Sequence, residues 1–276
     1  MRNESLFAVL MVDIKDSRKL SPKARQSAQE ELHAAMECTN AIYDHRIEKP
    51  LMFSAGDEIQ GLFAEPSDAF LAFRMLTLLC VNISLRGGIG IGSWETRISS
   101  DLSTEQDGSA YHDARKAINE AKIEKNDTLL VFQGGVNKLE VQIPAALSIE
   151  TIRDRSKSQR TVSRMVEMIR PLIPTDDEIQ DIEPFKMAEL QRGYLWQDFK
   201  SSVPDDYVMP VVVGRDLTKS ISSIDRSMAG IGYALSPIVE QSRQGLDKAL
   251  AKAKVLLERR AAAYAAYRLT EVYSND

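Results

Sequence analysis

The chain has 276 residues, of which 43% are hydrophobic and 27% are charged. These values are ordinary for soluble domains and exclude collagen-like, disordered and disulfide-scaffold proteins. The formal net charge of −5 gives no overall basic field, so any contact with nucleic acid must come from a local patch. No apolar run is long enough for a signal peptide or a membrane span, and Cys38 and Cys80 have no metal-ligand spacing. We therefore expect a cytoplasmic protein with two buried thiols and no membrane partner.

Strand and helix patterns alternate along the first half of the chain. Leu6–Ile14 is a continuous apolar run, which is typical of a strand buried on both faces. Ser21 and Pro22 are residue types that begin a helix, and Gly56-Asp57 is a strong signal for a hairpin turn. The predicted elements are a strand at 6–14, a helix at 21–47, strands at 51–55 and 58–64, a helix at 65–79, a strand at 85–96, a helix at 108–122 and a strand at 128–132.

Two of these elements carry further signals. The helix at 21–47 would span roughly 39 Å, so we expect a break within it. Its apolar stripe consists of Ala28, Leu32, Ala35, Met36, Thr39 and Ile42. The strand at 85–96 contains Gly87, Gly88, Gly90 and Gly92. Glycines in a strand indicate the close approach of a ligand or of another backbone.

From Pro144 onward the helical period dominates. The pattern predicts one helix at 147–172, a mixed segment at 175–223 with a strand-like run at 207–213, and helices again over 226–273. The order β-α-β-β-α-β-α-β, followed by helices, predicts an α+β fold. We expect one domain at 1–140 and a mostly helical domain at 141–276.

Two aspartates follow the predicted strands in a way that suggests a shared site. Asp13 ends the first strand, and Asp57 lies in the turn of the hairpin. If the first strand pairs beside the hairpin, both carboxylates converge at one end of the sheet, where they would favour a divalent cation such as Mg²⁺. The alternatives are that Asp57 serves only the turn and that Asp13 caps the end of its strand.

Four motifs of the chain resemble those of the SatD family. They are Asp13-x-x-x-Ser17-Arg18, Gly56-Asp57-Glu58, Arg86-Gly-Gly-Ile-Gly, and Asp107-Gly108-Ser109-Ala110-Tyr111-His112-x-Ala114-Arg115. The same region resembles the catalytic core shared by class III nucleotide cyclases and GGDEF-type diguanylate cyclases. The resemblance implies a ferredoxin-like, nucleotide-cyclase-like fold for residues 1–140, followed by a region with a helix-turn-helix. It also implies a homodimer, because class III sites commonly form between two subunits.

The same resemblance implies the residues of a site. Asp13, Asp57 and the carbonyl of Ile14 would hold Mg²⁺ or Mn²⁺. Class III cyclases carry an asparagine and, four residues later, an arginine on the helix after the glycine strand, whereas this chain has His112 and Lys116. Lys116 can meet phosphate charge as a point cation but cannot form a bidentate fork. The catalytic residues would be Asp13, Asp57 and Lys116, and the nucleotide-binding residues would be Ile14, Ser17, Arg18, Gly56, Glu58 and His112. The alternatives are a solvated loop at Ser17 and Arg18 and a surface or helix-cap role for His112.

The segments 227–235 and 242–250 resemble a helix-turn-helix. Ile231, Leu235, Leu246 and Ala249 would form its small core. The residues facing a DNA groove, where arginine and glutamine can read base edges, would be Ser242, Arg243, Gln244 and Lys248. The alternative is a plain helical bundle with a basic, solvated face.

Three functions follow as expectations. The first is a protein that binds a nucleoside triphosphate with a divalent metal, as a nucleotidyl cyclase or transferase or with slow or absent turnover. The second is a DNA-binding regulator that senses a nucleotide without catalysis. The third is a purely structural interaction module.

Overall fold

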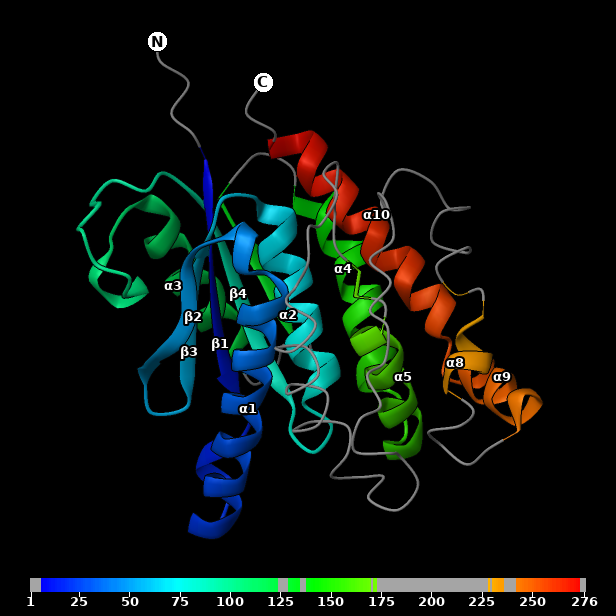
Figure 1. The fold of residues 1–276 in the computed structure, drawn as a ribbon. Coiled ribbons are helices and arrows are strands. Elements are labelled where there is room, and N and C mark those ends of the chain that lie inside the picture. Colours follow the sequence, from blue (N-terminus) through cyan, green and yellow to red (C-terminus); the bar gives the residue numbers. More distant parts are fainter. Residues whose placement is uncertain are drawn as a thin grey trace.

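A five-stranded mixed sheet, with strand order β2-β3-β1-β4-β5, forms the centre of the fold (Figure 1). The computed structural model describes residues 6–123, 129–134, 138–169, 171–172, 228, 230–235 and 242–273. Strand β1 pairs antiparallel with β3 and β4, β2 pairs antiparallel with β3, and β5 is parallel to β4. The strands are β1 (Phe7–Ile14), β2 (Ile47–Ala55), β3 (Glu58–Phe63), β4 (Leu85–Gly92) and β5 (Leu130–Gln133). The predicted α+β class is confirmed.

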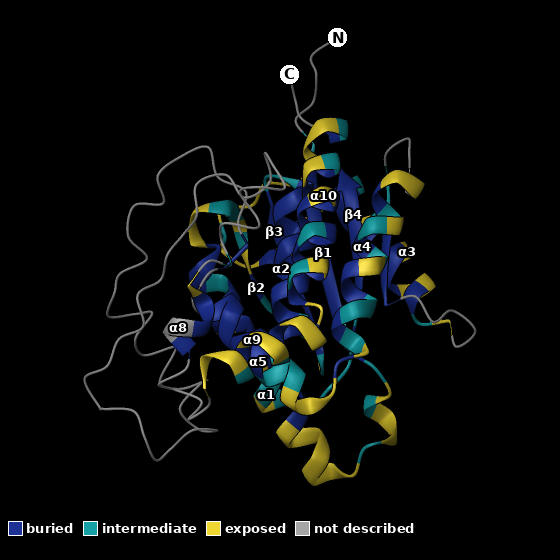
Figure 2. Ribbon diagram, turned by 90° about the vertical axis from the view of Figure 1, so that its right-hand side faces the viewer, coloured by how far each residue is buried: buried dark blue, intermediate teal, exposed yellow. Residues whose placement is uncertain are grey.

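Helices cover both faces of this sheet. Helix α3 lies on one face, α1 and α2 lie on the other, and α4, α5 and α10 pack outside α2 (Figures 1 and 2). The helices are α1 (Pro22–Ile42), α2 (Pro66–Leu79), α3 (Ser109–Ala121), α4 (Lys138–Arg153), α5 (Lys157–Ile169), α8 (Ile231–Leu235), α9 (Arg243–Lys252) and α10 (Val255–Tyr273). Among the residues described, no helix is both long enough and apolar enough to cross a membrane.

Side chains of β1 alternate between two hydrophobic clusters. Phe7, Val9 and Met11 pack with residues of α3, whereas the residues between them join the larger cluster on the α1 and α2 side. Both faces of β1 are therefore buried, as its continuous apolar run predicts. Because side chains of a strand alternate, Asp13 shares the α3 face with Met11.

The glycines of β4 allow α3 to lie directly on the sheet. A Cβ atom at Gly88 or Gly90 would collide with the backbone of α3 at Ile118 and Ala114 respectively. The predicted close approach is therefore that of a helix backbone. Along this contact α3 is antiparallel to β4. The C-terminal end of α3 therefore lies at the end of the sheet where Asp13 lies.

Helix α1 begins as predicted but ends earlier. The Ser21 side chain accepts a hydrogen bond from the Ala24 amide at 3.3 Å, and the whole predicted stripe of α1 is buried. The helix ends at Ile42, a 3₁₀ turn follows, and β2 already starts at Ile47. Asn40 exchanges two hydrogen bonds of 2.8 and 2.9 Å with the backbone of Leu51, which pins the end of the helix to β2. A break was therefore correctly expected, but continuing the helix to residue 47 was wrong.

The prediction of one helix at 147–172 was also wrong, because the chain forms two helices there. Helix α4 ends at Arg153, and α5 starts at Lys157. Ser156 and Gln159 form a capping box, in which the Ser156 amide donates to Gln159 Oε1 at 2.8 Å and the Gln159 amide donates to Ser156 Oγ at 3.4 Å. This reciprocal pair begins a new helix and so ends the previous one.

The hydrophobic core continues across residue 140. One cluster includes buried side chains from β1, α2, α4, α5, α9 and α10, and Figure 2 shows the dark, buried interior between these helices and the sheet. The two-domain division stays a prediction. The segment 175–223, with its strand-like run, lies outside the described residues.

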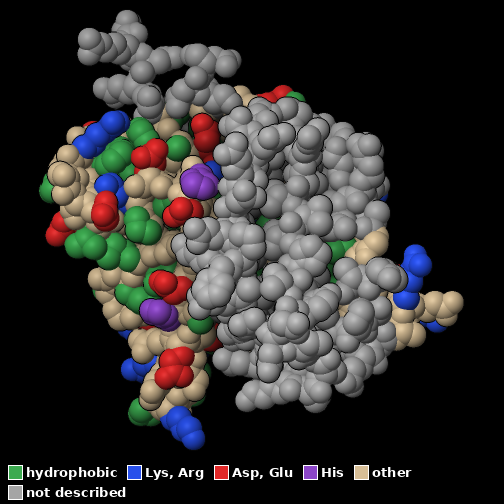
Figure 3. Space-filling model, in the orientation of Figure 1, with side chains coloured by type: hydrophobic (Ala, Val, Ile, Leu, Met, Phe, Trp, Pro, Cys, Tyr) green, Lys and Arg blue, Asp and Glu red, His purple; other side chains and the backbone are tan. Residues whose placement is uncertain are grey.

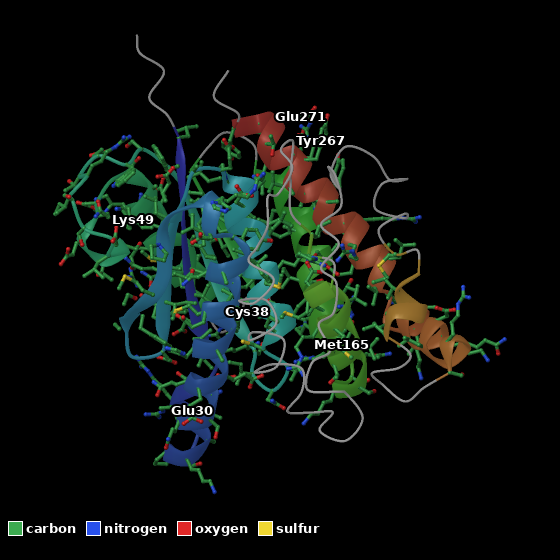
Figure 4. The ribbon with its side chains drawn as sticks, in the orientation of Figure 1. Glu30, Cys38, Lys49, Met165, Tyr267 and Glu271 are labelled. Atoms are coloured by element: carbon green, nitrogen blue, oxygen red, sulfur yellow. The ribbon has the colours of Figure 1, made fainter. Side chains whose placement is uncertain are left out.

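Both cysteines are free and buried, which confirms the expected thiols. The Sγ of Cys38, labelled on α1 in Figure 4, lies 3.6 Å from Met168 Sδ of α5. Burial raises the pKa of Cys38 to about 12 and raises that of Cys80 well above its usual value, so both are suited to packing.

Candidate functional site

Asp13 lies where three strands meet at one end of the sheet. In the strand register it is opposite Glu58 of β3 and Arg86 of β4. Residues paired directly across antiparallel strands project to the same face, so these three belong to the face that α3 covers. The predicted pairing of the first strand beside the hairpin is thus what the structure contains.

Two cations, Arg115 of α3 and Lys122 directly after this helix, lie beside these carboxylates. Lys122 Nζ is 3.5 Å from Asp13 Oδ2 and 3.2 Å from Glu58 Oε2, and Arg115 lies 2.7 Å from Glu58 Oε1. A spacing of seven residues puts Arg115 and Lys122 on one face of the helix. Sequence reasoning missed Lys122, although this spacing was a usable signal.

Lys116, the predicted catalytic cation, faces away from this cluster. It pairs with Asp113, one turn earlier on α3, at 2.8 Å, and its side chain is 69% exposed. At 1.5 Å per residue it lies about 9 Å along the helix axis from Lys122. Within one chain, the structure does not bring Lys116 to the aspartate pair.

Asp57 occupies the turn between β2 and β3. Gly56 before it has a φ of 60°, which is the left-handed conformation that favours glycine and allows the tight turn. The Oδ2 atom of Asp57 is buried and has no hydrogen-bond partner among the described residues. Asp57 is close enough to act on the ionisation of Asp13, so the structure brings the two predicted carboxylates together.

The charges of this cluster shift two pKa values in opposite directions. Burial raises the pKa of Asp13, Lys122 opposes that shift, and the neighbouring Asp57 and Glu58 add to it. Burial also acts on Glu58, but Arg115 and Lys122 outweigh it and lower the pKa of this carboxyl. Glu58 therefore stays ionised and paired, whereas Lys122 compensates the charge of Asp13 only in part.

This donor set fits a hard divalent cation that keeps other ligands. Among the residues described, no group of three or more His, Cys, Asp or Glu side chains is arranged to hold a metal ion. Mg²⁺ is usually bound by one or two carboxylates together with water and substrate phosphates. Asp13 and the unpartnered oxygen of Asp57 match that requirement. Two carboxylates are too few ligands for a closed structural metal site.

The loop after β1 lies at the same end of the sheet. Ile14 is the buried last residue of β1, and Ser17 begins a 3₁₀ turn, Ser17–Lys19, in which Arg18 is exposed. Asp16 adopts a left-handed φ of 59° and pairs with Lys19 at 3.0 Å, which shapes this turn. The nucleotide-binding roles of Ile14, Ser17 and Arg18 stay predictions.

A shallow cavity of about 500 Å³, which is open to solvent, lies between α1 and β2, next to the hairpin turn. It is lined by Gln29, Glu30, His33, Phe53 and Gly56. The rings of His33 and Phe53 are nearly parallel, at 15°, with centroids 6.1 Å apart. Figure 4 labels Glu30 on the lower part of α1, and Figure 3 shows a histidine beside acidic side chains over this part of the helix. Sequence reasoning missed this cavity, because packing of α1 on β2 creates it.

His112 lies at the other end of α3. It is exposed and is 3.5 Å from Asp107, at the start of the helix. Ten residues separate it from Lys122, which is about 15 Å along the axis. The structure therefore does not bring His112 to Asp13 and Asp57 of the same chain, and its proposed contact with a nucleotide stays a prediction.

Three of the four predicted DNA-contacting residues belong to α9, and the fourth, Ser242, directly precedes it. Ser242 caps this helix by accepting a hydrogen bond from the Gly245 amide at 3.2 Å. Arg243, Gln244 and Lys248 are exposed. The underside of α9 is buried through Leu246 and Leu250, which pack in the core together with Ile231 and Leu235 of α8. Residues 236–241, which connect α8 to α9, lie outside the described part, and DNA contact stays a prediction.

No curated protein matches this chain. The SatD family matches residues 7–202, which include every strand of the sheet, the Asp13 and Asp57 pair, and Lys122. This match spans well over half of the chain. The protein therefore belongs to the SatD family.

Proposed function

We propose that this protein binds a nucleoside triphosphate together with Mg²⁺ or Mn²⁺ at Asp13 and Asp57. The observation that carries the proposal is the buried Oδ2 of Asp57, which has no hydrogen-bond partner among the described residues and lies beside a second carboxylate. A buried carboxylate oxygen without a partner is costly, and a divalent cation would supply one. When bound, such an ion would polarise phosphate oxygens.

The topology supports a relation to nucleotide cyclases. Strands β2-β3-β1-β4 are antiparallel neighbours joined by α1 and α2 in the order β-α-β-β-α-β. This is the arrangement expected of a ferredoxin-like, nucleotide-cyclase-like domain. In that domain the metal ligands would be Asp13, Asp57 and the carbonyl of Ile14.

The cavity between α1 and β2 is suited to the base of the nucleotide. Its wall offers the rings of His33 and Phe53, on which a base can stack. Gln29 donates to the Gly56 carbonyl at 3.4 Å, so the cavity borders the residue that precedes Asp57. A nucleotide with its base here would direct its phosphates toward Asp57 at the hairpin turn.

The positions of the remaining residues favour binding with slow or absent turnover. Catalysis needs donors aimed at the charge that develops on the reacting phosphates. Lys116 is paired with Asp113, and His112 lies at the far end of α3. Within one chain neither can serve the metal site, and a homodimer is the arrangement in which a second copy could supply them.

Calorimetry on the full chain tests the proposed function. We expect Mg²⁺ with at least one of ATP, GTP, CTP and UTP to bind the wild type, and Asp57→Asn to weaken that binding at least tenfold. Asp101→Asn is the matched control, because this carboxylate is fully exposed and lies 3.9 Å from Lys49, away from the site. Equal affinities of the two variants would contradict the proposal.

A second candidate function is DNA binding by α9. Exposure of Arg243, Gln244 and Lys248 above a buried underside favours it. Binding to genomic fragments should weaken steeply with salt, with a logarithmic slope of about 0.9 for each phosphate contact. Arg243→Ala should reduce sequence preference more than nonspecific affinity, and no binding at low salt would leave α9 as part of a helical bundle.

A further inference from the structure

The ammonium group of Lys122 already occupies the carboxylate cluster. It is within 3.5 Å of both Asp13 Oδ2 and Glu58 Oε2. Among the residues described, Lys122 is the one cation paired with Asp13. Any divalent ion that uses Asp13 as a ligand must therefore share this carboxylate with a positive charge already in contact with it.

In the described part of the chain, the carboxylate of Glu58, unlike that of Asp13, has other partners besides Lys122. Its Oε1 accepts hydrogen bonds from Arg115 at 2.7 Å and from the Ser54 hydroxyl at 3.2 Å. Removal of Lys122 from the cluster leaves Glu58 paired and leaves Asp13 without its cation. The competition between Lys122 and a metal ion thus centres on Asp13.

Lys122 is also able to leave the cluster without disturbing the fold. It follows the last residue of α3, and its side chain is one third exposed. Its charge sits on a flexible four-carbon stem, so the ammonium group can turn toward solvent or toward an incoming anion while the helix stays in place.

We infer that Lys122 couples the binding of metal to the binding of nucleotide. This inference rests on the proposed function and adds a rule for how the two ligands bind. Without nucleotide, Lys122 neutralises Asp13 and opposes the metal ion. A polyphosphate gives Lys122 another partner and frees Asp13 as a ligand. Each ligand therefore favours the other, as linkage requires.

Two separate titrations of the full chain test this coupling. The first measures binding of Mn²⁺ alone by electron paramagnetic resonance. The second measures binding of ATP and of GTP in EDTA, without any metal. We expect Lys122→Met to strengthen binding of Mn²⁺ alone and to weaken metal-free nucleotide binding, each by about tenfold, since a single charge contact is exchanged in each case. A purely structural role would weaken both.

Two variants control for fold and charge. Lys122→Arg keeps the cation and should resemble the wild type in both titrations. Lys252→Met removes an exposed cation at the end of α9, away from the cluster, and should leave both unchanged. Urea unfolding of Lys122→Met checks its fold, and Lys122→Gln is measured as a second neutral variant.

The outcomes separate this coupling from the proposed function. If the wild type binds Mn²⁺ and nucleotide but the neutral Lys122 variants shift both affinities in the same direction, or shift neither, the coupling is overturned while the site stands. If the wild type binds neither Mn²⁺ nor any nucleoside triphosphate, both ideas are overturned.

Discussion

Arg74 of α2 and Glu258 of α10 are joined by two hydrogen bonds, of 2.6 and 3.0 Å, although 184 residues separate them in the sequence. Both side chains are 1% exposed. Arg74 also binds Glu167 of α5 at 2.7 Å, and Arg259 binds the same glutamate at 2.6 Å. These ion pairs join α2, which packs on the sheet, to α5 and α10.

We predict that breaking this buried pair strongly destabilises the fold. Glu258→Ala leaves Arg74 and Arg259 to share Glu167, so buried positive charge is in excess; breaking a buried ion pair in this way typically costs about 3–5 kcal/mol. Replacing both residues, as in Arg74→Met with Glu258→Met, should recover part of that loss. Urea unfolding measures both effects, and Glu271→Ala on the exposed end of α10 is the control. A single variant as stable as this control would contradict the prediction.

A second prediction concerns the pH dependence of stability. Asp68 lies in the first turn of α2, is 1% exposed and binds Arg46 at 3.2 Å. Burial raises the pKa of its carboxyl to about 7, although Arg46 opposes the shift. The folded chain then holds this proton between about pH 4 and pH 7, where the unfolded chain has lost it. Stability should consequently fall as pH rises through this window.

Asp68→Asn tests this dependence, because an amide cannot titrate and its oxygen can still accept from Arg46. Unfolding free energies at pH 4, 5.5 and 7 should fall less steeply in the variant than in the wild type. Glu167 and Glu258 have lowered pKa values, since their arginine partners outweigh burial, so their contribution is lost only in more acid solution. Identical pH profiles for variant and wild type would contradict the assignment to Asp68.

How much of this structure the sequence predicts depends on how local each signal is. The hairpin at Gly56-Asp57 and the strand ending at Asp13 follow from short patterns, and together they predict the convergence of the two aspartates. Lys122 reaches Asp13 only because α3 lies on the glycines of β4, a contact between distant segments. The sequence shows the seven-residue spacing from Arg115 to Lys122, but it does not show which way that face of the helix points.

The two errors at helix ends have different causes. The Ser156 and Gln159 capping box is a local signal that was present in the sequence and was missed. The early end of α1 depends on Asn40 binding the backbone of Leu51, which a helical pattern alone does not reveal. The cavity beside α1 also arises from packing, because its wall combines one helix with a strand that follows it.

The cavity yields a third prediction. Phe53→Ala should weaken nucleoside triphosphate binding about tenfold, because stacking of a base on an aromatic ring contributes about 1–3 kcal/mol. Inorganic tripolyphosphate lacks a base, so its affinity should not change. Calorimetry with both ligands measures the difference, and Phe53→Leu separates loss of the ring from loss of volume. If tripolyphosphate affinity falls equally, the cavity does not hold the base.

The fourth prediction decides between an enzyme and a sensor. A nucleotide cyclase must stabilise charge between the α- and β-phosphates as the ribose hydroxyl attacks. In this chain Lys116 is paired with Asp113, and His112 lies at the far end of α3. Loss of one good hydrogen-bond donor costs about 10²–10³ in rate. Incubation with each nucleoside triphosphate and Mn²⁺, followed by mass spectrometry, should therefore show bound nucleotide with little pyrophosphate or cyclic product. Fast release of pyrophosphate that Asp13→Ala abolishes would instead make this protein an enzyme, with a second copy of the chain as the source of the missing donors.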